Sequence, residues 1–528
     1  MNIFDCKPTW RSRLLYSLLS ALLFSCAWAF KGFGTPALFV ALIPLLSISR
    51  SYGSSWREAG KMALWATLTL ILWHLACTWW VWNAAAIGTI AASVIGTWWC
   101  LLPLMLFHIV SKRMPKAIAY TLLVTAWIAC EHIYIKAPAL SFPWLTLGNG
   151  FTFNTWAVQW YEYTGVLGGS LWVLVANIAI YEAKRWVKVA VIVLPILVSL
   201  VLYGINSPKG ESYTSRQSVK IASVQPNVDC YTKFLIPREN LQKDLMQQLR
   251  EAPQDADFIL MPETSLATTV NERFVAATRI VQGFTSHLKS VNSKSMVIAG
   301  TESLMAYGNR RKSDTNRRSA NGTYYDIFNS SIGICSSPLN IPIHNKCKLV
   351  VGVETLPAWF RAGGIFEVDL GGTAGQLGIG KSAEPFTHNE IKIAPAICYE
   401  ALYGDFMGEF VRNGAQIISV VSNDGWWGDT PGYKYLFAYC RLRAIEHRRD
   451  VARSANTGIS GFINSRGDVL QTLGWDNKGI ITEQLRLNDK QTFYTRHGDY
   501  IGRLSLYVAL LCLLYTVAVL SKRKFYLD

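Results

Sequence analysis

Three positions in the second half of the chain combine residue types that can carry out nucleophilic chemistry. Glu263 follows the apolar run Phe258–Met261, and Cys398 ends the strand-like run Ile391–Ile397. Lys346 lies in a stretch that combines polar and apolar residues. A carboxylate at a strand end is partly desolvated, which raises its pKa and suits it to proton transfer. A cysteine at a strand-to-helix turn lies near backbone N–H groups and a helix N-terminus, which lower a thiol pKa.

Together these residue types can perform covalent acyl transfer. Cys398 would attack a carbonyl carbon, Glu263 would accept the thiol proton, and Lys346 would stabilise the oxyanion of the tetrahedral intermediate. Taken singly, each has a simpler interpretation as a buried inert cysteine, a polar strand-end residue or a surface lysine. No Ser/His/Asp arrangement or glycine-rich phosphate loop competes with this set. The 11 cysteines form no close pair or Cys/His cluster, so we predict no disulfide framework, no metal site and no cofactor.

The region that must position these side chains, residues 217–489, reads as a globular domain. Strand-like and helix-like stretches alternate along it, which predicts an α/β sandwich with buried sheets. The strand-like stretches are Val219–Val224, Phe258–Met261, Met296–Gly300, Ile391–Ile397 and Ile417–Val421. The helix-like stretches are Arg238–Glu251, Asn271–Leu288 and Ala401–Val411.

The rest of the chain is too apolar for an ordinary soluble protein. Hydrophobic residues make up 51% of the 528 residues and charged residues only 16%. The pattern predicts about eight membrane spans: about seven in an N-terminal domain over residues 1–210, and one C-terminal transmembrane helix over 503–521. The apolar stretch Ala37–Ile48 is short enough to be re-entrant instead. The apolar stretches are Leu14–Phe30, Ala37–Ile48, Met62–Trp82, Ile87–Val110, Ala117–Tyr134, Val158–Tyr181, Val189–Tyr203 and Leu504–Leu520.

The net charge of +16 could indicate a nucleic-acid partner, but its distribution favours membrane topology. Clusters of Lys and Arg precede the first span and follow the second, fourth, sixth and last spans, so they all fall on one side of the predicted membrane. Because basic loops stay in the cytoplasm, this places the large domain outside the cytoplasm. The clusters are Lys7, Arg11 and Arg13; Arg50, Arg57 and Lys61; Lys112, Arg113 and Lys116; Lys184, Arg185 and Lys188; and Lys522, Arg523 and Lys524.

Several longer runs surround the reactive residues. They are Cys398-Tyr399-Glu400, Ser422-Asn423-Asp424-Gly425-Trp426-Trp427-Gly428-Asp429, Arg441-Leu442-Arg443-Ala444-Ile445-Glu446, the stretch Arg453–Ile459 and, in the apolar part, Phe142-Pro143-Trp144-Leu145. With these runs and its spans, the chain resembles the apolipoprotein N-acyltransferases, membrane-embedded members of the nitrilase, or carbon–nitrogen hydrolase, superfamily. The resemblance covers nearly the whole chain.

The resemblance implies a multi-span α-helical membrane domain and a nitrilase-like αββα sandwich. It implies that the catalytic residues are Glu263, Lys346 and Cys398. It also implies supporting roles for a second glutamate, Glu354, and for Tyr399 and Glu400. Lys348 is a rival for the role of the lysine, but it breaks the spacing to the second glutamate.

The family reaction implied is the last step of bacterial lipoprotein maturation. A fatty acyl chain passes from a membrane phospholipid to a cysteine thioester, and then to the N-terminal α-amino group of a diacylglyceryl-cysteine lipoprotein. The implied location is the bacterial inner membrane, multi-pass, with the catalytic domain on the periplasmic side and no nucleic-acid partner. The alternative is a membrane-tethered nitrilase-type amidase or hydrolase, which would transfer the acyl group to water.

Two departures from the family pattern affect the expected site. Val351-Gly352-Val353 replaces the usual Pro-Phe-Gly before Glu354, so the loop that carries this glutamate can sit differently. Phe234 stands where the family has a tryptophan. We expect Phe234, Trp426 and Trp427 to form a lipid-facing substrate entrance, with plain packing as the alternative.

Overall fold

A computed structural model describes residues 6–7, 9–206, 218–337, 341–356 and 376–525, with side chains as far as Lys522. The chain forms two units. The first comprises Met1–Trp82, Ala86–Ile205 and His497–Asp528, and the second comprises Asn83–Ala85 and Asn206–Arg496. The predicted domain junction at 210–217 lies outside the described residues, and so do the side chains of Arg523 and Lys524.

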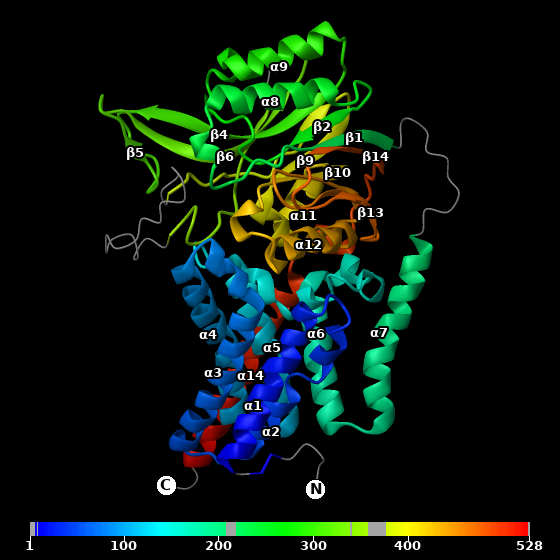
Figure 1. Ribbon diagram of the computed structural model, residues 1–528. Helices are drawn as coiled ribbons and strands as arrows, with labels where there is room; N and C mark the ends of the chain where they lie inside the picture. Colours follow the sequence, from blue (N-terminus) through cyan, green and yellow to red (C-terminus); the bar gives the residue numbers. More distant parts are fainter. Residues whose placement is uncertain (1–5, 8, 207–217, 338–340, 357–375, 526–528) are drawn as a thin grey trace. The chain divides into compact units, whose positions relative to one another are not determined.

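The first unit is a bundle of long apolar helices (Figure 1). Among the described residues, seven helices are long and apolar enough to cross a membrane, six before the second unit and one after it. They are α1 (Trp10–Ala29), α3 (Trp56–Thr78), α4 (Ala86–Ser111), α5 (Lys116–Lys136), α6 (Tyr161–Glu182), α7 (Arg185–Ile205) and α14 (Tyr500–Phe525).

The prediction of about eight spans, seven of them N-terminal, is therefore one too many. The stretch Ala37–Ile48 does not form a spanning helix. It contributes to a 3-10 turn, Thr35–Phe39, and to the short helix α2, Ile43–Arg50. Each of these pieces has a proline in its first turn, a position that proline favours because no helical hydrogen bond is lost there.

Basic residues from different loops of the first unit lie close together. Arg13, in the first turn of α1, donates to the backbone carbonyl of Ser51, after α2. Arg50 and Lys116 both contact the carboxylate of Glu182 at the end of α6, at 2.6 Å and 2.7 Å. Loops that the charge pattern assigns to the same side of the membrane are therefore in contact in the folded bundle.

The second unit contains two mixed β-sheets (Figure 1). In the first sheet the strand order is β14-β1-β2-β4-β6-β5, with β3 paired to β4 and β7 paired to β6; in the second it is β13-β12-β11-β10-β9-β8. The first sheet consists of β1 (Ser218–Gln225), β2 (Phe258–Met261), β3 (Thr269–Asn271), β4 (Met296–Gly308), β5 (Arg317–Arg318), β6 (Tyr324–Ile334), β7 (Ile343–Asn345) and β14 (Gly479–Arg486). The second consists of β8 (Phe386–His388), β9 (Ile391–Ile397), β10 (Ile417–Ser422), β11 (Val451–Ala455), β12 (Ser460–Ile463) and β13 (Val469–Leu473).

Helices cover the outer faces of both sheets. Helices α8 (Arg238–Glu251) and α9 (Arg279–Ser290) pack their apolar residues on β1, β2 and β4 in one hydrophobic core. Helices α11 (Gly404–Arg412) and α12 (Pro431–His447) cover the second sheet (Figure 1). The predicted αββα sandwich is confirmed. The helix expected over Asn271–Leu288 begins only at Arg279, because the residues before it form the end of β3 and a 3-10 turn.

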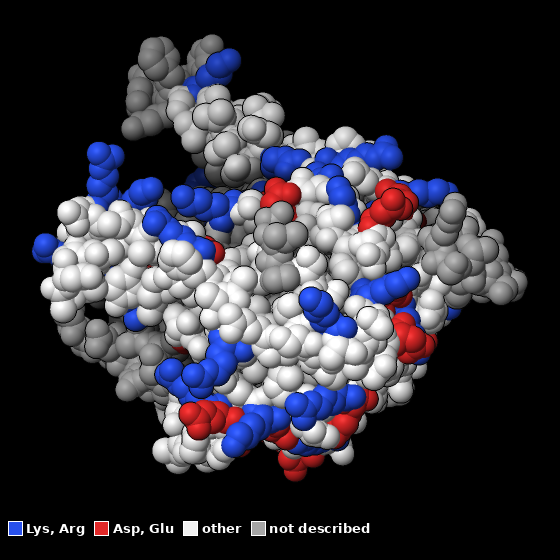
Figure 2. All heavy atoms as spheres, turned by 90° about the horizontal axis from the view of Figure 1, so that it is seen from above, with Lys and Arg blue, Asp and Glu red and all other residues white. Residues whose placement is uncertain are grey.

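The parallel pairs explain why the reactive residues can meet. Strand β2 is parallel to β1 and β4, and β9 is parallel to β10. Parallel strands end at the same edge of their sheet, so the residues just after β9 and β10 are presented together in the second sheet. Glu263, after β2 of the first sheet, meets them across the sandwich, where it accepts the backbone N–H of Asn423. Elsewhere on the molecule, charge is not sorted by sign: on the face in Figure 2, acidic and basic side chains are interspersed among uncharged residues.

Candidate active site

Cys398 lies on a sharp turn directly after β9. Its backbone φ is 49°, in the left-handed region that non-glycine residues rarely adopt, and the 3-10 helix Cys398–Leu402 begins at the same residue. Such a conformation costs on the order of 1–3 kcal/mol and persists only where surrounding contacts hold it. The side chain is buried, with 5% of its surface exposed. The strand-to-helix turn expected from the sequence is present.

Glu263 follows β2 and is held by contacts to its backbone and its carboxylate. Gly300, on the neighbouring strand β4, lies so close that a Cβ there would be 2.5 Å from the Cα of Glu263, so this position requires glycine. The Glu263 carboxylate contacts the Lys346 ammonium at 3.0 Å, and the backbone N–H of Asn423, after β10, donates to its other oxygen at 2.9 Å.

Lys346 joins two carboxylates. It follows β7, and its Nζ contacts Glu263 at 3.0 Å and Glu354 at 2.9 Å. Burial alone would lower the pKa of Lys346, but the charges of these two carboxylates outweigh burial and raise this pKa well above its usual value. Lys346 is therefore a fixed cation. Its rival Lys348 points elsewhere, with its Nζ over the ring of Tyr403 at 5.5 Å.

Glu354 reaches the site in spite of the altered loop. Gly352 adopts a φ of 86°, and the backbone N–H of Val350 donates to Glu354 at 2.8 Å, which closes a short turn. The departure at Val351-Gly352-Val353 therefore leaves the glutamate against Lys346. The glutamate of the family pattern is therefore in place, although the three loop residues before it differ from that pattern.

Asn329 is a site residue that the sequence analysis missed. It lies in the middle of β6, and its Nδ2 donates to Glu263 at 2.7 Å and to Glu354 at 2.8 Å. It thus holds the two carboxylates on either side of Lys346. The only local signal is the polar run Asn329-Ser330-Ser331 inside a buried strand.

The proton affinity of Cys398 differs from the expectation. The turn was expected to lower the thiol pKa, but burial raises it, and the negative charge of Glu263 raises it further; Lys346 only partly opposes this. The expectation was wrong because it considered only the local turn. At neutral pH Cys398 is a thiol, with a carboxylate and an ammonium nearby.

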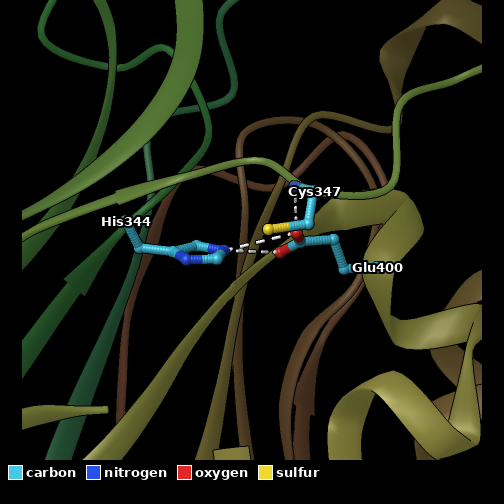
Figure 3. A group of neighbouring side chains, drawn as sticks. All are labelled: His344, Cys347 and Glu400. Atoms are coloured by element: carbon cyan, nitrogen blue, oxygen red, sulfur yellow. Dashed lines mark hydrogen bonds and ion pairs between the residues drawn. The ribbon is translucent and has the colours of Figure 1, made fainter. Parts of the chain in front are cut away.

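Glu400 and two residues from the segment around Lys346 form a buried cluster (Figure 3). The carboxylate of Glu400 contacts His344 Nε2 at 3.0 Å and accepts the backbone N–H of Cys347 at 2.7 Å and that of Ile397 at 2.8 Å. The sequence analysis expected no Cys/His cluster, yet donor atoms of His344, Cys347 and Glu400 lie within 4.8 Å of one another. These are zinc-ligand types. Each Glu400 oxygen also accepts a backbone N–H, and these two bonds link the segment after Lys346 to the turn at Cys398.

The three proposed entrance residues lie in two segments of the second unit. Phe234 is exposed, on a short 3-10 turn, whereas Trp426 and Trp427 are half-buried. The Trp426 ring meets that of Tyr231 edge to face at 5.6 Å, and the Tyr231 hydroxyl donates to the Trp426 carbonyl at 2.7 Å. The two segments therefore form one aromatic surface. Tyr399, by contrast, is buried and packs on Tyr403.

The sequence of this chain matches models of two known protein families. A family model described as "Carbon-nitrogen hydrolase" matches residues 220–494, more than half of the chain. The chain belongs to the carbon–nitrogen hydrolase family. A second model, "Apolipoprotein N-acyltransferase N-terminal domain", matches residues 20–179 of this carbon–nitrogen hydrolase.

Relatives of this carbon–nitrogen hydrolase match along nearly the full chain. The apolipoprotein N-acyltransferase of Chlorobaculum tepidum is 27% identical over 92% of each chain, and that of Geobacter metallireducens is 23% identical over 94% of each. The resemblance to apolipoprotein N-acyltransferases is confirmed. Seven helices among the described residues are apolar and long enough to cross a membrane, so the chain is a membrane protein of the nitrilase superfamily; at family level it is an acyltransferase.

Two solved structures are similar to about half of the chain. A CN-hydrolase superfamily protein from Xanthomonas campestris is 13% identical with a TM-score of 0.35, and Nit3 of Saccharomyces cerevisiae is 17% identical with a TM-score of 0.37. Each alignment covers 51% of this chain and 90% of the other.

Proposed function

We propose that this protein transfers a fatty acyl chain from a membrane phospholipid to the N-terminal α-amino group of a diacylglyceryl-cysteine lipoprotein, through a thioester on Cys398. The observation that carries the proposal is the contact of the buried Lys346 with Glu263 and Glu354. The charges of Lys346 and Glu263 in turn shift the pKa of the Cys398 thiol. These residues belong to a chain whose described part includes seven apolar helices that could span a membrane.

In the first half-reaction, Cys398 forms a covalent acyl-enzyme. Glu263 accepts the thiol proton as the sulfur attacks the ester carbonyl of the phospholipid. Lys346 stabilises the oxyanion, and the backbone N–H of Tyr399, next to the nucleophile, is the proposed second donor. The intermediate collapses by breaking the ester C–O bond, Glu263 returns the proton to the leaving oxygen, and a lysophospholipid departs.

In the second half-reaction, the α-amino group of the lipoprotein attacks the thioester carbonyl. Glu263 accepts a proton from the amine, the C–S bond breaks, and the sulfur of Cys398 recovers a proton. The products are an N-acyl lipoprotein and free enzyme. Glu354 and Asn329 keep Lys346 and Glu263 in place through both steps by the contacts described above.

The membrane spans suit such substrates. Both are lipids, and moving an acyl chain out of the bilayer costs about 0.8 kcal/mol for each buried CH₂ group. An enzyme anchored in the bilayer meets them without extracting them. The aromatic surface of Tyr231 and Trp426, with the exposed Phe234 and Leu235, is the proposed substrate entrance.

We place the protein in the bacterial inner membrane with the catalytic domain on the periplasmic side. The contacts of Arg13 with Ser51, and of Arg50 and Lys116 with Glu182, support a common, cytoplasmic side for these basic segments. Cys335, partly exposed in the second unit, should then react with a membrane-impermeant maleimide in intact spheroplasts. Protection of Cys335 until the membrane is lysed would place the domain in the cytoplasm.

The test of function is transfer of a labelled acyl chain. Purified protein is incubated with a phospholipid labelled in its acyl chain, and label on Cys398 is measured with and without a diacylated lipopeptide. The proposal expects a hydroxylamine-sensitive adduct, and passage of the label to the peptide amine. Release as free fatty acid in the presence of the peptide would instead identify a membrane-tethered hydrolase, and absence of any adduct would refute the covalent mechanism.

Replacing Glu263 by Gln should change two reactions of Cys398 in opposite directions. Loss of the general base should slow adduct formation with phospholipid by about 10²–10⁴-fold. Loss of the carboxylate charge should lower the thiol pKa, because Glu263 raises it and Lys346 lowers it. Alkylation by iodoacetamide at neutral pH should therefore become faster, since the thiolate is the reactive form.

Wild-type alkylation should be slow at neutral pH and rise as the pH is raised. Glu302→Gln, a carboxylate on the nearby strand β4, is the control and should leave both rates unchanged. An unchanged alkylation rate in Glu263→Gln would show that this carboxylate does not act on the thiol, and a slower rate would show that its charge does not raise the thiol pKa.

A further inference from the structure

Glu400 connects the backbones next to two reactive residues. One oxygen accepts the N–H of Cys347, the residue after Lys346, at 2.7 Å. The other accepts the N–H of Ile397, the residue before Cys398, at 2.8 Å. A single side chain therefore ties the segment that carries the ammonium to the turn that carries the thiol.

His344 is the side chain that holds Glu400 in this arrangement. It lies on β7, and its Nε2 contacts the Glu400 carboxylate at 3.0 Å (Figure 3). Its ring meets Phe410 of α11 edge to face at 5.1 Å, and its strand pairs with β6. Both side chains of the pair are almost completely buried, at 2% and 0% exposure. The orientation of the imidazole is therefore set by its contacts with Glu400 and Phe410.

A buried carboxylate must be compensated to remain ionised. Burial alone would raise the pKa of Glu400, but His344 and the two backbone N–H donors together hold it below its usual value. If the imidazole donor is removed, two backbone donors remain to support a fully buried charge. We expect Glu400 then to rotate or take up a proton, and either change weakens its bonds to Cys347 and Ile397.

We propose that His344 is a positioning residue for acyl transfer: acting through Glu400, it sets the separation between the Lys346 ammonium and the Cys398 thiol. This inference rests on the proposed function for its catalytic consequence. His344 itself does not take part in the chemistry. Its contribution is to hold Lys346 where the oxyanion forms, and a displacement of about 1 Å at such a site can cost about 10²-fold in rate.

Two amide variants separate positioning from packing. His344→Gln keeps an N–H donor at the place of Nε2, whereas His344→Asn presents its amide one bond short of Glu400. The measurements are the single-turnover rate of label transfer to Cys398, the KM for phospholipid, the alkylation rate of Cys398 by iodoacetamide and the melting temperature. We expect His344→Asn to form the adduct about 10–100-fold more slowly with little change in KM, and His344→Gln to keep a rate within about threefold of wild type.

The alkylation rate makes the test independent of the lipid reaction. Because the thiol pKa depends on the distances to Glu263 and Lys346, we expect His344→Asn to shift the pH profile of alkylation and His344→Gln to leave it in place. Wild-type adduct and alkylation rates in His344→Asn would overturn the inference and leave the proposed function standing. Equal losses in both variants, parallel to a fall in melting temperature, would reduce His344 to a packing role. If wild type forms no adduct, the proposed function fails, and an unshifted alkylation profile would refute the positioning role as well.

Discussion

Replacing Cys398 by Ala is expected to abolish formation of the acyl-enzyme and to lower acyl transfer by about 10⁴-fold or more, because no other group can take the place of the nucleophile in a covalent mechanism. The variant should still fold, because the substitution removes one small buried sulfur atom and breaks no ion pair. The measurement is the amount of acylated protein at fixed time with labelled phospholipid, followed by the initial rate of lipopeptide acylation.

Cys440 provides a matched control for this substitution. It is also a fully buried free cysteine in the catalytic unit, on α12, and its thiol donates to the carbonyl of Leu436. Cys440→Ala removes the same atoms at a similar cost in packing, but we expect it to keep nearly full activity. Acyl transfer by Cys398→Ala above about a hundredth of the wild-type rate would exclude the thioester route.

Replacing Lys346 by Met is expected to reduce both stability and activity. The ammonium compensates Glu263 and Glu354 at 3.0 Å and 2.9 Å, and its loss leaves the buried Glu263 and the partly buried Glu354 carboxylates without a cation. Removing one partner of a buried ion pair typically costs about 3–5 kcal/mol of unfolding free energy. Loss of the oxyanion donor should in addition slow acyl transfer by about 10²–10³-fold.

The pH dependence of the Lys346→Met variant follows from the same contacts. Without the cation, one of the two carboxylates should have a raised pKa in the folded protein, so that protonation favours the folded state. The stability deficit should therefore shrink as the pH is lowered and grow as it is raised. Thermal melts across the acidic to neutral range measure this slope, and a deficit that grows on acidification would contradict the assignment.

A second substitution and a neighbouring lysine test the origin of the effect. Glu354→Gln added to Lys346→Met should recover part of the lost stability, because it removes one of the repelling charges, while activity stays low. Lys348→Met is the control: this lysine lies over aromatic rings and contacts neither carboxylate in the described structure, so we expect near-normal stability and activity. Equal effects at Lys346 and Lys348 would refute the assigned pairing.

Much of the candidate site could be predicted because its signals are local. Glu263 and Cys398 each follow a short apolar run, and the strand character of such a run depends on the residues within it. No local sequence pattern singled out Lys346, because Lys348 lies in the same stretch of sequence only two positions away. Its selection came from the family spacing to Glu354, and the fold then places it between the two carboxylates.

The partners of these residues could not be predicted in the same way. Asn329 and Asn423 lie 66 and 160 positions from Glu263 in the chain, and His344 lies 56 positions from Glu400. No local pattern brings such pairs together. The pairing of β6 with β4 and of β4 with β2 brings Asn329 toward Glu263, and the packing of the two sheets brings Asn423 to Glu263 and His344 to Glu400.

The direction of the Cys398 pKa shift shows the same limit. The turn after β9 was correctly expected, and by itself it favours a thiolate. Burial and the charge of Glu263, which comes from the other sheet, reverse that preference. The number of membrane spans was also overcounted, because hydropathy alone did not show that Thr35–Arg50 divides into a 3-10 turn and a short helix, each with a proline in its first turn.

The sequence by itself determined the apolar segments, the alternation of strands and helices, and the types of the reactive residues, because hydropathy and residue type are properties of the chain alone. Only the tertiary structure decided which carboxylates share Lys346, which residue clamps Glu400, and whether Cys398 holds its proton. Electrostatic energies depend on separation and burial in space, and these are set by strand pairing between segments far apart in the chain.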